Sequence, residues 1–377
     1  MLRRLSQLHR CLPVSRLVHD VADATKEAAA TTQSASHKFG PSAQWISAGM
    51  MLRMRRPKAA QSVAGRWSEG CLTVRQDESC MQAVRLMAAN DVGCLVVLDP
   101  LAETVTGIIT ERCYSREVIL KGRDSDTTTV AECMKRDVVC CTVDEKLSVI
   151  ASVLSKHKIR HLPVLHGTTG ITAEEHVLRL HTPTMHLKGV LSIKDVAFML
   201  FCLVRNELQG RGIGNITVAD MMPDRSLGGT LPVINAGSTV LEAIGQMANT
   251  DQHALCVLDH DDGGLVGIIT TRDYICKMKV HGRESASTRV RSVMTPTPQC
   301  ASPDFTLDDV LQLFTTFGFR HLPVVSAIMP GHVAARPSLH PHVVGLLSIN
   351  DVLRTICAWP DRPLHWPCGQ QPLDTAV

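Results

Sequence analysis

The chain has 377 residues, of which 45% are hydrophobic and 3% aromatic, and its formal net charge is +3. Its first 58 positions hold ten Lys or Arg against three acidic residues, which leaves a net charge of 3 − 7 = −4 on the remainder. Such a chain is long enough for two domains with real cores, but its acidic main part and scarce aromatics argue against a nucleic-acid interface.

The first nineteen residues contain four arginines and no acidic residue, and Leu2, Leu5 and Leu8 can share one side of a helix. This composition resembles a mitochondrial presequence, and the following stretch rich in Ala, Ser and Thr indicates disorder. We therefore expect residues 1–59 to be the presequence and disordered linker of a mitochondrial matrix protein. A merely basic disordered tail, on a cytoplasmic protein, is the alternative.

Membrane helices and metal centres have no clear signature in this sequence. No apolar run reaches the roughly 18 residues that a membrane helix needs, so we expect no membrane span. The fourteen cysteines include no C-x-x-C pair, which argues against a zinc site or a disulfide framework. We assign most of them to the core of a protein in a reducing compartment.

The first repeat unit reads strand, helix, strand, strand, helix. Residues 79–89 place apolar side chains at helical spacing, and residues 94–98 form a short apolar run typical of a buried strand. A polar turn leads to a second strand at 105–109, and a helix begins near Thr110. A short strand at 72–74 precedes these elements and completes a βαββα order.

The second unit follows the same order, with a helix at 148–156, strands at 161–165 and 188–191, and a helix from Ile193. A loop at 167–187 separates its strands, and a similar loop lies at 326–342 in the last unit. Each loop holds three histidines: His176, His181 and His186 in one, and His332, His340 and His342 in the other. The loops share no histidine spacing, so we interpret these residues as solvated rather than as zinc ligands.

The chain is a duplication, because landmarks recur after 160 residues. Gly107 corresponds to Gly267, and RHLP at 160–163 recurs at 320–323. Each half also holds two copies of a strand that ends in a hydroxyl residue, and in three of the four copies a carboxylate follows three positions later, whereas the first copy has a cysteine there. These copies are GIITERC from Gly107, GVLSIKD from Gly189, GIITTRD from Gly267 and GLLSIND from Gly345. With a glycine-rich boundary at 209–214, we predict repeat pairs at 60–208 and 215–359 and a disordered tail at 360–377.

The recurring hydroxyl and carboxylate have two interpretations. As a helix cap, the hydroxyl accepts from a backbone N–H of the first turn, and the carboxylate reaches back to the cap residue. As a ligand site, the helix N-terminus attracts a phosphate and the carboxylate accepts both hydroxyls of a ribose. A capping box prefers Glu or Gln at its fourth position, whereas the intact copies carry Asp, which favours a ligand role beside the cap.

Residues from about 72 to 359 resemble four cystathionine-β-synthase (CBS) domains arranged as two Bateman pairs. Segments 110–134 (TERCYSREVILKGRDSDTTTVAECM) and 270–294 (TTRDYICKMKVHGRESASTRVRSVM) are similar to CBS-pair proteins of bacteria and plant mitochondria. The RHLPV strands fit the second domain of each pair. The resemblance implies an α/β fold of four βαββα repeats joined through their sheets, with clefts that bind AMP, ADP, ATP or S-adenosylmethionine.

Transferred by motif position, the resemblance also implies a set of nucleotide-binding residues. Asp195, Asp273 and Asp351 would hold ribose hydroxyls, and the hydroxyl residues near ribose or phosphate would be Thr110, Ser192, Thr270 and Ser348. The residues expected to contact phosphate or line the clefts are Arg160, His161, Arg320 and His321, with Arg112, Lys194 and Arg272 as further candidates. Each of these basic residues could instead be an exposed charge at the end of a helix or strand.

The first repeat departs from the motif at Cys113, which stands where its duplicate has Asp273. A thiol is a weak donor and acceptor and cannot replace a carboxylate that accepts two hydrogen bonds. We therefore expect this site to be weakened or lost, so that the first pair binds mainly through its second domain.

From these patterns we predict a noncatalytic regulatory protein that senses adenine nucleotides and controls a separate partner enzyme. It would form a homo-oligomer through its CBS pairs. The sequence has no P-loop, no G-x-S-x-G and no H-E-x-x-H motif, so we do not expect an enzyme. The alternative function is a structural adaptor that oligomerises through CBS pairs whose sites are empty or degenerate.

Overall fold

The computed structural model of the chain describes residues 47–54, 67–68, 71–101, 104–166, 178–179, 186–207, 215–222, 231–326 and 341–358. The expected presequence and most of its linker, the boundary at 209–214 and the tail at 360–377 lie outside the described residues. So do the loop histidines His176, His181, His332 and His340.

The first repeat folds as the sequence predicts. Its elements are β1 (Trp67–Ser68), β2 (Cys71–Arg75), α4 (Cys80–Ala89), β3 (Cys94–Leu98), β4 (Val105–Thr110), α5 (Glu111–Tyr114), the π-helix η2 (Ser115–Ile119) and α6 (Val130–Cys133). The sheet has the order β1-β2-β3-β4, in which β2 and β3 are parallel and β3 and β4 antiparallel. Ser79 begins α4, because its side chain accepts from the N–H of Gln82.

The third repeat is the structural duplicate of the first. Its elements are β9 (Val233–Asn235), α10 (Val240–Asn249), β10 (Ala254–Leu258), β11 (Leu265–Thr270), α11 (Thr271–Lys277), the 3₁₀ turns η5 (Lys279–His281) and η6 (Val290–Ser292), and β12 (Thr295–Pro296). Strand β10 pairs in parallel with β9 and antiparallel with β11. The 160-residue period therefore reflects two copies of one architecture.

The second and fourth repeats contain the remaining elements. The second has α3 (Ala48–Met54), β5 (Val139–Thr142), α7 (Leu147–Lys156), β6 (His161–His166), β7 (Leu178–Arg179), β8 (His186–Ser192) and α8 (Ile193–Glu207). The fourth has α9 (Val218–Met221), α12 (Leu307–Phe317), β13 (His321–Ser326), β14 (His342–Ser348) and α13 (Ile349–Ala358). The loop predicted at 167–187 needs correction, since it includes β7, which pairs with β5, and ends inside β8.

Helix α3 precedes the first repeat in sequence but packs into the second. The N–H of Ala48 donates to the carbonyl of Glu145 at 2.8 Å, and that of Gly49 donates to the carbonyl of Val143 at 2.7 Å. Apolar side chains of α3 lie in the same core as those of α7, and α9 contributes to that core from the fourth repeat. The predicted boundary at residue 60 is therefore misplaced, because it cuts α3 from the pair that it completes.

Sheets join the two repeats of each pair. In the first pair, Val96 of β3 and Leu165 of β6 lie in one apolar cluster. In the second pair, Cys256 of β10 and Leu346 of β14 lie in another. These buried contacts between β-sheets confirm the expected CBS-pair arrangement.

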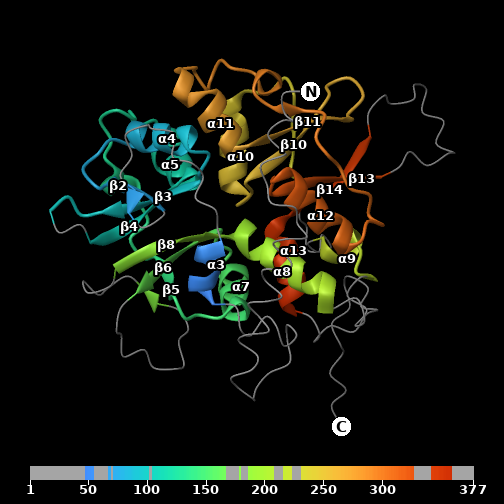
Figure 1. The fold of residues 1–377 in the computed structure, drawn as a ribbon. Helices are drawn as coiled ribbons and strands as arrows, with labels where there is room; N and C mark the ends of the chain where they lie inside the picture. The colour runs from blue at the N-terminus through green and yellow to red at the C-terminus, as the bar shows by residue number, and fades with distance from the viewer. Residues whose placement is uncertain are drawn as a thin grey trace, which may run out of the picture.

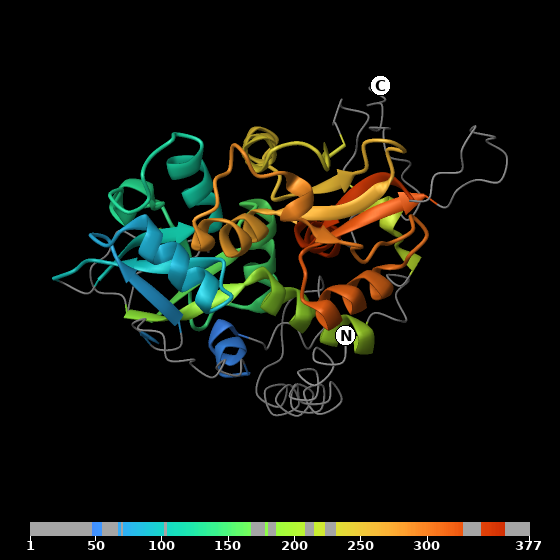
Figure 2. The ribbon, with the colours of Figure 1, turned by 90° about the horizontal axis from the view of Figure 1, so that it is seen from above.

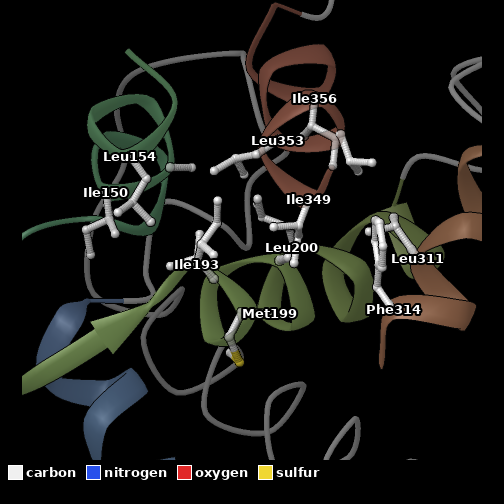
Figure 3. Close-up of a cluster of buried hydrophobic side chains, with 14 of the residues drawn as sticks. Ile150, Leu154, Ile193, Met199, Leu200, Leu311, Phe314, Ile349, Leu353 and Ile356 are labelled. Carbon is white, nitrogen blue, oxygen red and sulfur yellow. The ribbon is translucent and has the colours of Figure 1, made fainter. Parts of the chain in front are cut away.

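Helices join one pair to the other. The first and third repeats share a core that contains Tyr114 and Tyr274, where α11 contacts both α4 and α5. The second and fourth repeats share a second core, which we call the helical seam, built by α7, α8, α12 and α13. Figure 3 shows Leu154 of α7, Leu200 of α8 and Leu353 of α13 within this seam.

The four repeats form a closed ring within one chain. Each repeat touches one neighbour through its sheet and another through its helices. Figures 1 and 2 show the first and third repeats side by side, as the shared core requires. The helical faces of each pair are therefore covered by the other pair of the same chain. Among the described helices, none is long and apolar enough to cross a membrane.

The glycine that opens the motif copies is needed for close packing. A Cβ added at Gly267 would lie 2.5 Å from Sδ of Met294, and one at Gly107 would lie 2.7 Å from the carbonyl oxygen of Lys135. At Gly189 the added atom would lie 2.8 Å from a methyl of Leu52 on α3. The recurring glycine thus lets a neighbouring segment approach the strand.

Candidate functional site

The intact motif copies form complete helix caps. In the third repeat, the N–H and hydroxyl of Thr270 both donate to Oδ2 of Asp273, at 2.9 and 2.6 Å, and the Asp273 N–H donates to the Thr270 hydroxyl at 3.2 Å. Ser192 with Asp195 and Ser348 with Asp351 repeat these bonds. Aspartate at the fourth position therefore does not by itself favour a ligand role over a cap, since the hydroxyl and the aspartate satisfy each other here.

Cys113 supports only half of such a cap. Its N–H donates to the hydroxyl of Thr110 at 3.1 Å, and that hydroxyl lies 3.1 Å from the sulfur. Position 113 has no carboxylate that could accept from the Thr110 N–H. Sulfur is a weak acceptor and does not replace it. The helix still begins, but it lacks the carboxylate that the other three copies present.

Backbone hydrogen bonds define four equivalent positions just before strands β3, β6, β10 and β13. In each repeat, the first N–H of the motif helix donates to the carbonyl of the residue at this position. The four donor–acceptor pairs are Glu111 to Gly93 at 3.2 Å, Ile193 to Arg160 at 2.9 Å, Thr271 to His253 at 3.3 Å and Ile349 to Arg320 at 3.0 Å. The fold thus aims two arginines and one histidine from equivalent places, with a glycine at the fourth.

These positions meet at the centre of the ring. A Cβ added at Gly93 would lie 3.3 Å from Nη2 of Arg272, 3.3 Å from Cε1 of His161 and 3.4 Å from Nη1 of Arg320, which come from three other repeats. The rings of His253 and His321 have centroids 6.4 Å apart, and Arg112 approaches His253 at 3.4 Å. We call the following residues the central cluster: Arg112, Arg160, Arg272, Arg320, His161, His253, His321 and Glu111.

One buried carboxylate stands among these cations. Glu111 is 2% exposed, and its Oε1 accepts from Nε of Arg272 at 2.8 Å, while its Oε2 lies 3.7 Å from Nη2 of Arg320. Burial works against the charged form of Arg272, but the carboxylates of Glu111 and Asp91 outweigh this effect and raise its pKa. Glu111 therefore neutralises part of the cluster and ties the third and fourth repeats to the first.

Arg160 has no such partner. Its side chain is 9% exposed, and among the described residues none forms a hydrogen bond or ion pair with its guanidinium. Burial, reinforced by the nearby guanidinium of Arg320, lowers its pKa to about 9, and the charge of Glu111 offsets only part of this effect. A buried cation without a counter-charge is costly, so this position is suited to receive an anion.

Two histidines of the cluster, His253 and His321, are held neutral. Burial lowers the pKa of His253 and of His321, and the positive charge of Arg160 acts in the same direction on both. Neutral imidazoles can donate or accept hydrogen bonds without adding to the positive charge.

The structure sorts the predicted site residues into two groups. The basic ones, Arg160, His161, Arg272, Arg320 and His321, come together in the central cluster. The hydroxyl and carboxylate residues stay at the motif helices of their own repeats: Thr110, Ser192, Asp195, Thr270, Asp273, Ser348 and Asp351. Sequence analysis missed His253 and Glu111. The signal for His253 was its place directly before strand β10, the place that Arg160 holds before β6 and Arg320 holds before β13.

No group of three or more potential metal ligands occurs among the residues that the structure describes. His186 and His342 lie at the starts of β8 and β14, and His342 is exposed.

Comparisons with known proteins place these features in context. The model of the CBS domain matches residues 68–116, 130–181, 210–279 and 290–358. The chain is 26% identical over 265 residues to CBS domain-containing protein CBSCBSPB2 of Arabidopsis thaliana, which covers 67% of this chain and 48% of that protein. It therefore spans about half the length of the first curated relatives that it matches.

Two further similarities concern one half of the chain and the whole fold. A 124-residue segment is 33% identical to the mitochondrial CBS domain-containing protein CBSX3 of Arabidopsis thaliana, covering 32% of this chain and 58% of that protein. The crystal structure of protein MJ1225 from Methanocaldococcus jannaschii, described as a candidate archaeal homologue of γ-AMPK, superposes with a TM-score of 0.54 at 17% identity. It covers 77% of this chain and 97% of that one, which supports the ring of four repeats as a known fold.

Proposed function

The chain belongs to the CBS domain family, and on that premise we propose that it is a noncatalytic regulatory protein that binds adenosine nucleotides in its pairs. In this proposal the phosphates lie against the central cluster. The ribose hydroxyls bond to the motif aspartates at the helix starts. Occupancy of these sites would then control a partner protein.

The observation that carries the proposal is the buried guanidinium of Arg160, which has no hydrogen bond or ion pair to any residue that the structure describes. The centre contains one arginine from each repeat, and the carboxylates that contact these arginines are Glu111, Asp91 and Asp251. Among the described residues, four guanidiniums face these three carboxylates, one of which also contacts Arg116, and this leaves an excess of positive charge around the buried Arg160. Phosphate oxygens would supply the missing negative charge through charge-assisted hydrogen bonds.

The same excess charge ranks the ligands. AMP, ADP and ATP bring two or more negative charges to the centre, whereas S-adenosylmethionine brings a positive sulfonium. A cationic site with a buried arginine favours the first three. We therefore expect nucleotides to bind more tightly than S-adenosylmethionine.

The ribose part of the proposal concerns the second, third and fourth repeats. Asp195, Asp273 and Asp351 each keep one carboxylate oxygen in the helix cap, and the second oxygen is the one a ribose hydroxyl would reach. Cys113 offers no such oxygen, so we propose that the first repeat contributes its basic residues to the centre but holds no ribose.

Calorimetric titration of the full chain with AMP, ADP, ATP, S-adenosylmethionine and adenosine tests the proposal. Replacing Arg160 with Met should weaken the binding of AMP at least about tenfold, equivalent to about 1.4 kcal/mol. It should leave the affinity for adenosine almost unchanged. Replacing Asp273 with Ala should weaken both ligands. Lys156→Met, on the same repeat and outside the central cluster, is the matched control.

A folded sample that gives no binding heat with any of these ligands would overturn the proposal. It would move the choice to the alternative function, a structural adaptor that uses its CBS pairs only to assemble. An Arg160→Met variant that binds AMP as the wild type does would instead show that the phosphates lie elsewhere.

We also propose a mitochondrial location. It rests on the basic, acid-free N-terminal segment and on the similarity to mitochondrial CBSX3. Fusing residues 1–59 to a fluorescent reporter should send the reporter into mitochondria, and a diffuse cytosolic signal would contradict this.

A further inference from the structure

The carboxylate of Asp273 is fully engaged in hydrogen bonds. Its Oδ2 accepts from the N–H and the hydroxyl of Thr270. Its Oδ1 accepts from the hydroxyl of Thr295 at 3.1 Å and lies 2.6 Å from Nζ of Lys277. A carboxylate has about four acceptor positions, and four donors occupy them here.

Lys277 connects Asp273 to the segment that follows the helix. Besides Asp273, its ammonium donates to the carbonyl of Val293 at 2.9 Å and to the hydroxyl of Thr295 at 3.1 Å. An ammonium has three donors, so Lys277 is also fully used. Together these bonds hold the start of β12 against helix α11.

The lysine four positions after the motif residue occurs in the third repeat and not at the matching positions of the other three. In the first repeat the positions of Asp273, Lys277 and Thr295 hold Cys113, Glu117 and Lys135. The residues four positions after Asp195 and Asp351 are Met199 and Thr355, neither of which carries a charge. Asp351 contacts Arg354 instead, at 3.2 Å from a different helix position.

We propose that Lys277 is a latch on the Asp273 site, which a ribose must open before it can bind. The inference rests on the proposed function, because it assigns to Asp273 the ribose described above. Each ribose hydroxyl that bonds to this carboxylate has to displace one of the four present donors. Lys277 therefore lowers the affinity of the third site for a ribose.

Lys277 is the donor that can leave most easily. Thr270 is fixed by the backbone at the helix start, where its bonds to Asp273 satisfy the first turn. The Lys277 side chain is 42% exposed, whereas that of Asp273 is 11% exposed. The ammonium can swing into water and recover its hydrogen bonds there, and its departure also frees Thr295 from one contact.

Adenosine is the probe that tests the latch, since it has the ribose but no phosphate that Lys277 could contact. Lys277→Met keeps the length of the side chain and removes its donors. We expect this variant of the full chain to bind adenosine about fivefold more tightly, because a helical ion pair and a charge-assisted bond no longer compete with the ribose. Lys279→Met, two residues further along, is the matched control and should bind as the wild type does.

A double variant shows whether the gain passes through Asp273. Adding Lys277→Met to Asp273→Ala should produce no gain over Asp273→Ala alone, since there is then no carboxylate to release. Equal or weaker adenosine binding by Lys277→Met, with Asp273→Ala still weakening the wild type, overturns the latch and leaves the proposed function intact. If Asp273→Ala changes nothing for any ligand, the assignment of ribose to Asp273 fails and the latch fails with it.

Discussion

Glu111 is the buried counter-charge of the central cluster. It bonds to Arg272 and faces Arg320 while almost wholly buried, so its removal leaves two guanidiniums without their shared counter-charge. Glu111→Gln keeps the shape and removes the charge. We expect the free energy of unfolding to fall by about 1.5 to 3 kcal/mol, measured by denaturant titration, and AMP to bind more tightly because the centre becomes more positive.

The control for this prediction is Glu117→Gln. Glu117 contacts Lys121 on the surface of the same repeat, where the side chains are 36% and 50% exposed. An exposed pair of this kind contributes little, so stability and AMP affinity should both stay near the wild-type values. A Glu111→Gln variant with unchanged stability would contradict the role of Glu111.

The neutral histidines make stability depend on pH. In the folded chain, His253 and His321 have a pKa below the usual 6.5. Below about pH 6.5 the unfolded state therefore binds more protons than the folded state, and this binding stabilises the unfolded state. The folded protein should lose up to about 1.4 kcal/mol per pH unit below about 6.5 for each histidine. Melting at pH 7.5 and 5.5 should show a smaller pH effect in the His253→Gln, His321→Gln double variant. His260→Gln, at a side chain that is 84% exposed, should keep the wild-type slope.

At the scale of elements, the two contacts between pairs use the same positions with different chemistry. Between the first and third repeats, Arg112 of α5 pairs with Asp251, and Arg272 of α11 pairs with Asp91. Both aspartates have a left-handed backbone conformation, and each follows a helix of the other repeat, α10 or α4. Between the second and fourth repeats, the equivalent Lys194 donates to the carbonyl of Gly318 at 3.0 Å. The last equivalent is Asn350, whose Oδ1 is buried and makes no hydrogen bond to any described residue. Ion pairs therefore help to join the first repeat to the third. The contact between the second and fourth repeats depends more on apolar packing in the helical seam.

Leu353 of α13 tests how far the helical seam joins the pairs. It is 1% exposed and lies in the core shared with α7 and α8 (Figure 3). Leu353→Ala should lower the free energy of unfolding by about 2 to 5 kcal/mol. The control variant Leu241→Ala should change it little, because Leu241 is 37% exposed. Hydrogen exchange should speed up in α7, although α7 belongs to the other pair. Exchange that changes in α13 alone would mean that the pairs unfold independently.

At the scale of the whole molecule, each pair needs the other to cover its helices. The cores of the ring contain residues of both pairs, so a single pair exposes a large apolar face. We expect residues 47–208, the first pair with α3 included, to form a homodimer that copies the ring, because a second copy offers an equivalent helical face. Light scattering measures the mass, and a stable monomer of this fragment would contradict the prediction. A fragment from residue 60 should be less stable, because it lacks α3.

The sequence by itself determined the repeat architecture, because short-range patterns encode it. The spacing of apolar residues after Ser79, the strand at 94–98 and the caps formed by Thr270 with Asp273 depend on neighbours a few residues away. For the same reason, the replacement of the aspartate by Cys113 could be recognised without a structure. The 160-residue period then indicated that the two halves share one fold.

Only the tertiary structure decided where these parts meet. Glu111, His253 and Arg160 lie far apart in the chain and become one cluster through ring closure, which depends on the summed packing of four helical faces and four sheets. Helix α3 belongs to a repeat that begins nearly a hundred residues later, and no local pattern marks that choice. Lys277 could be seen in the sequence as a charge on a helix. Its role followed only once all four acceptor positions of Asp273 were found occupied, since the saturation of a carboxylate depends on three-dimensional contacts.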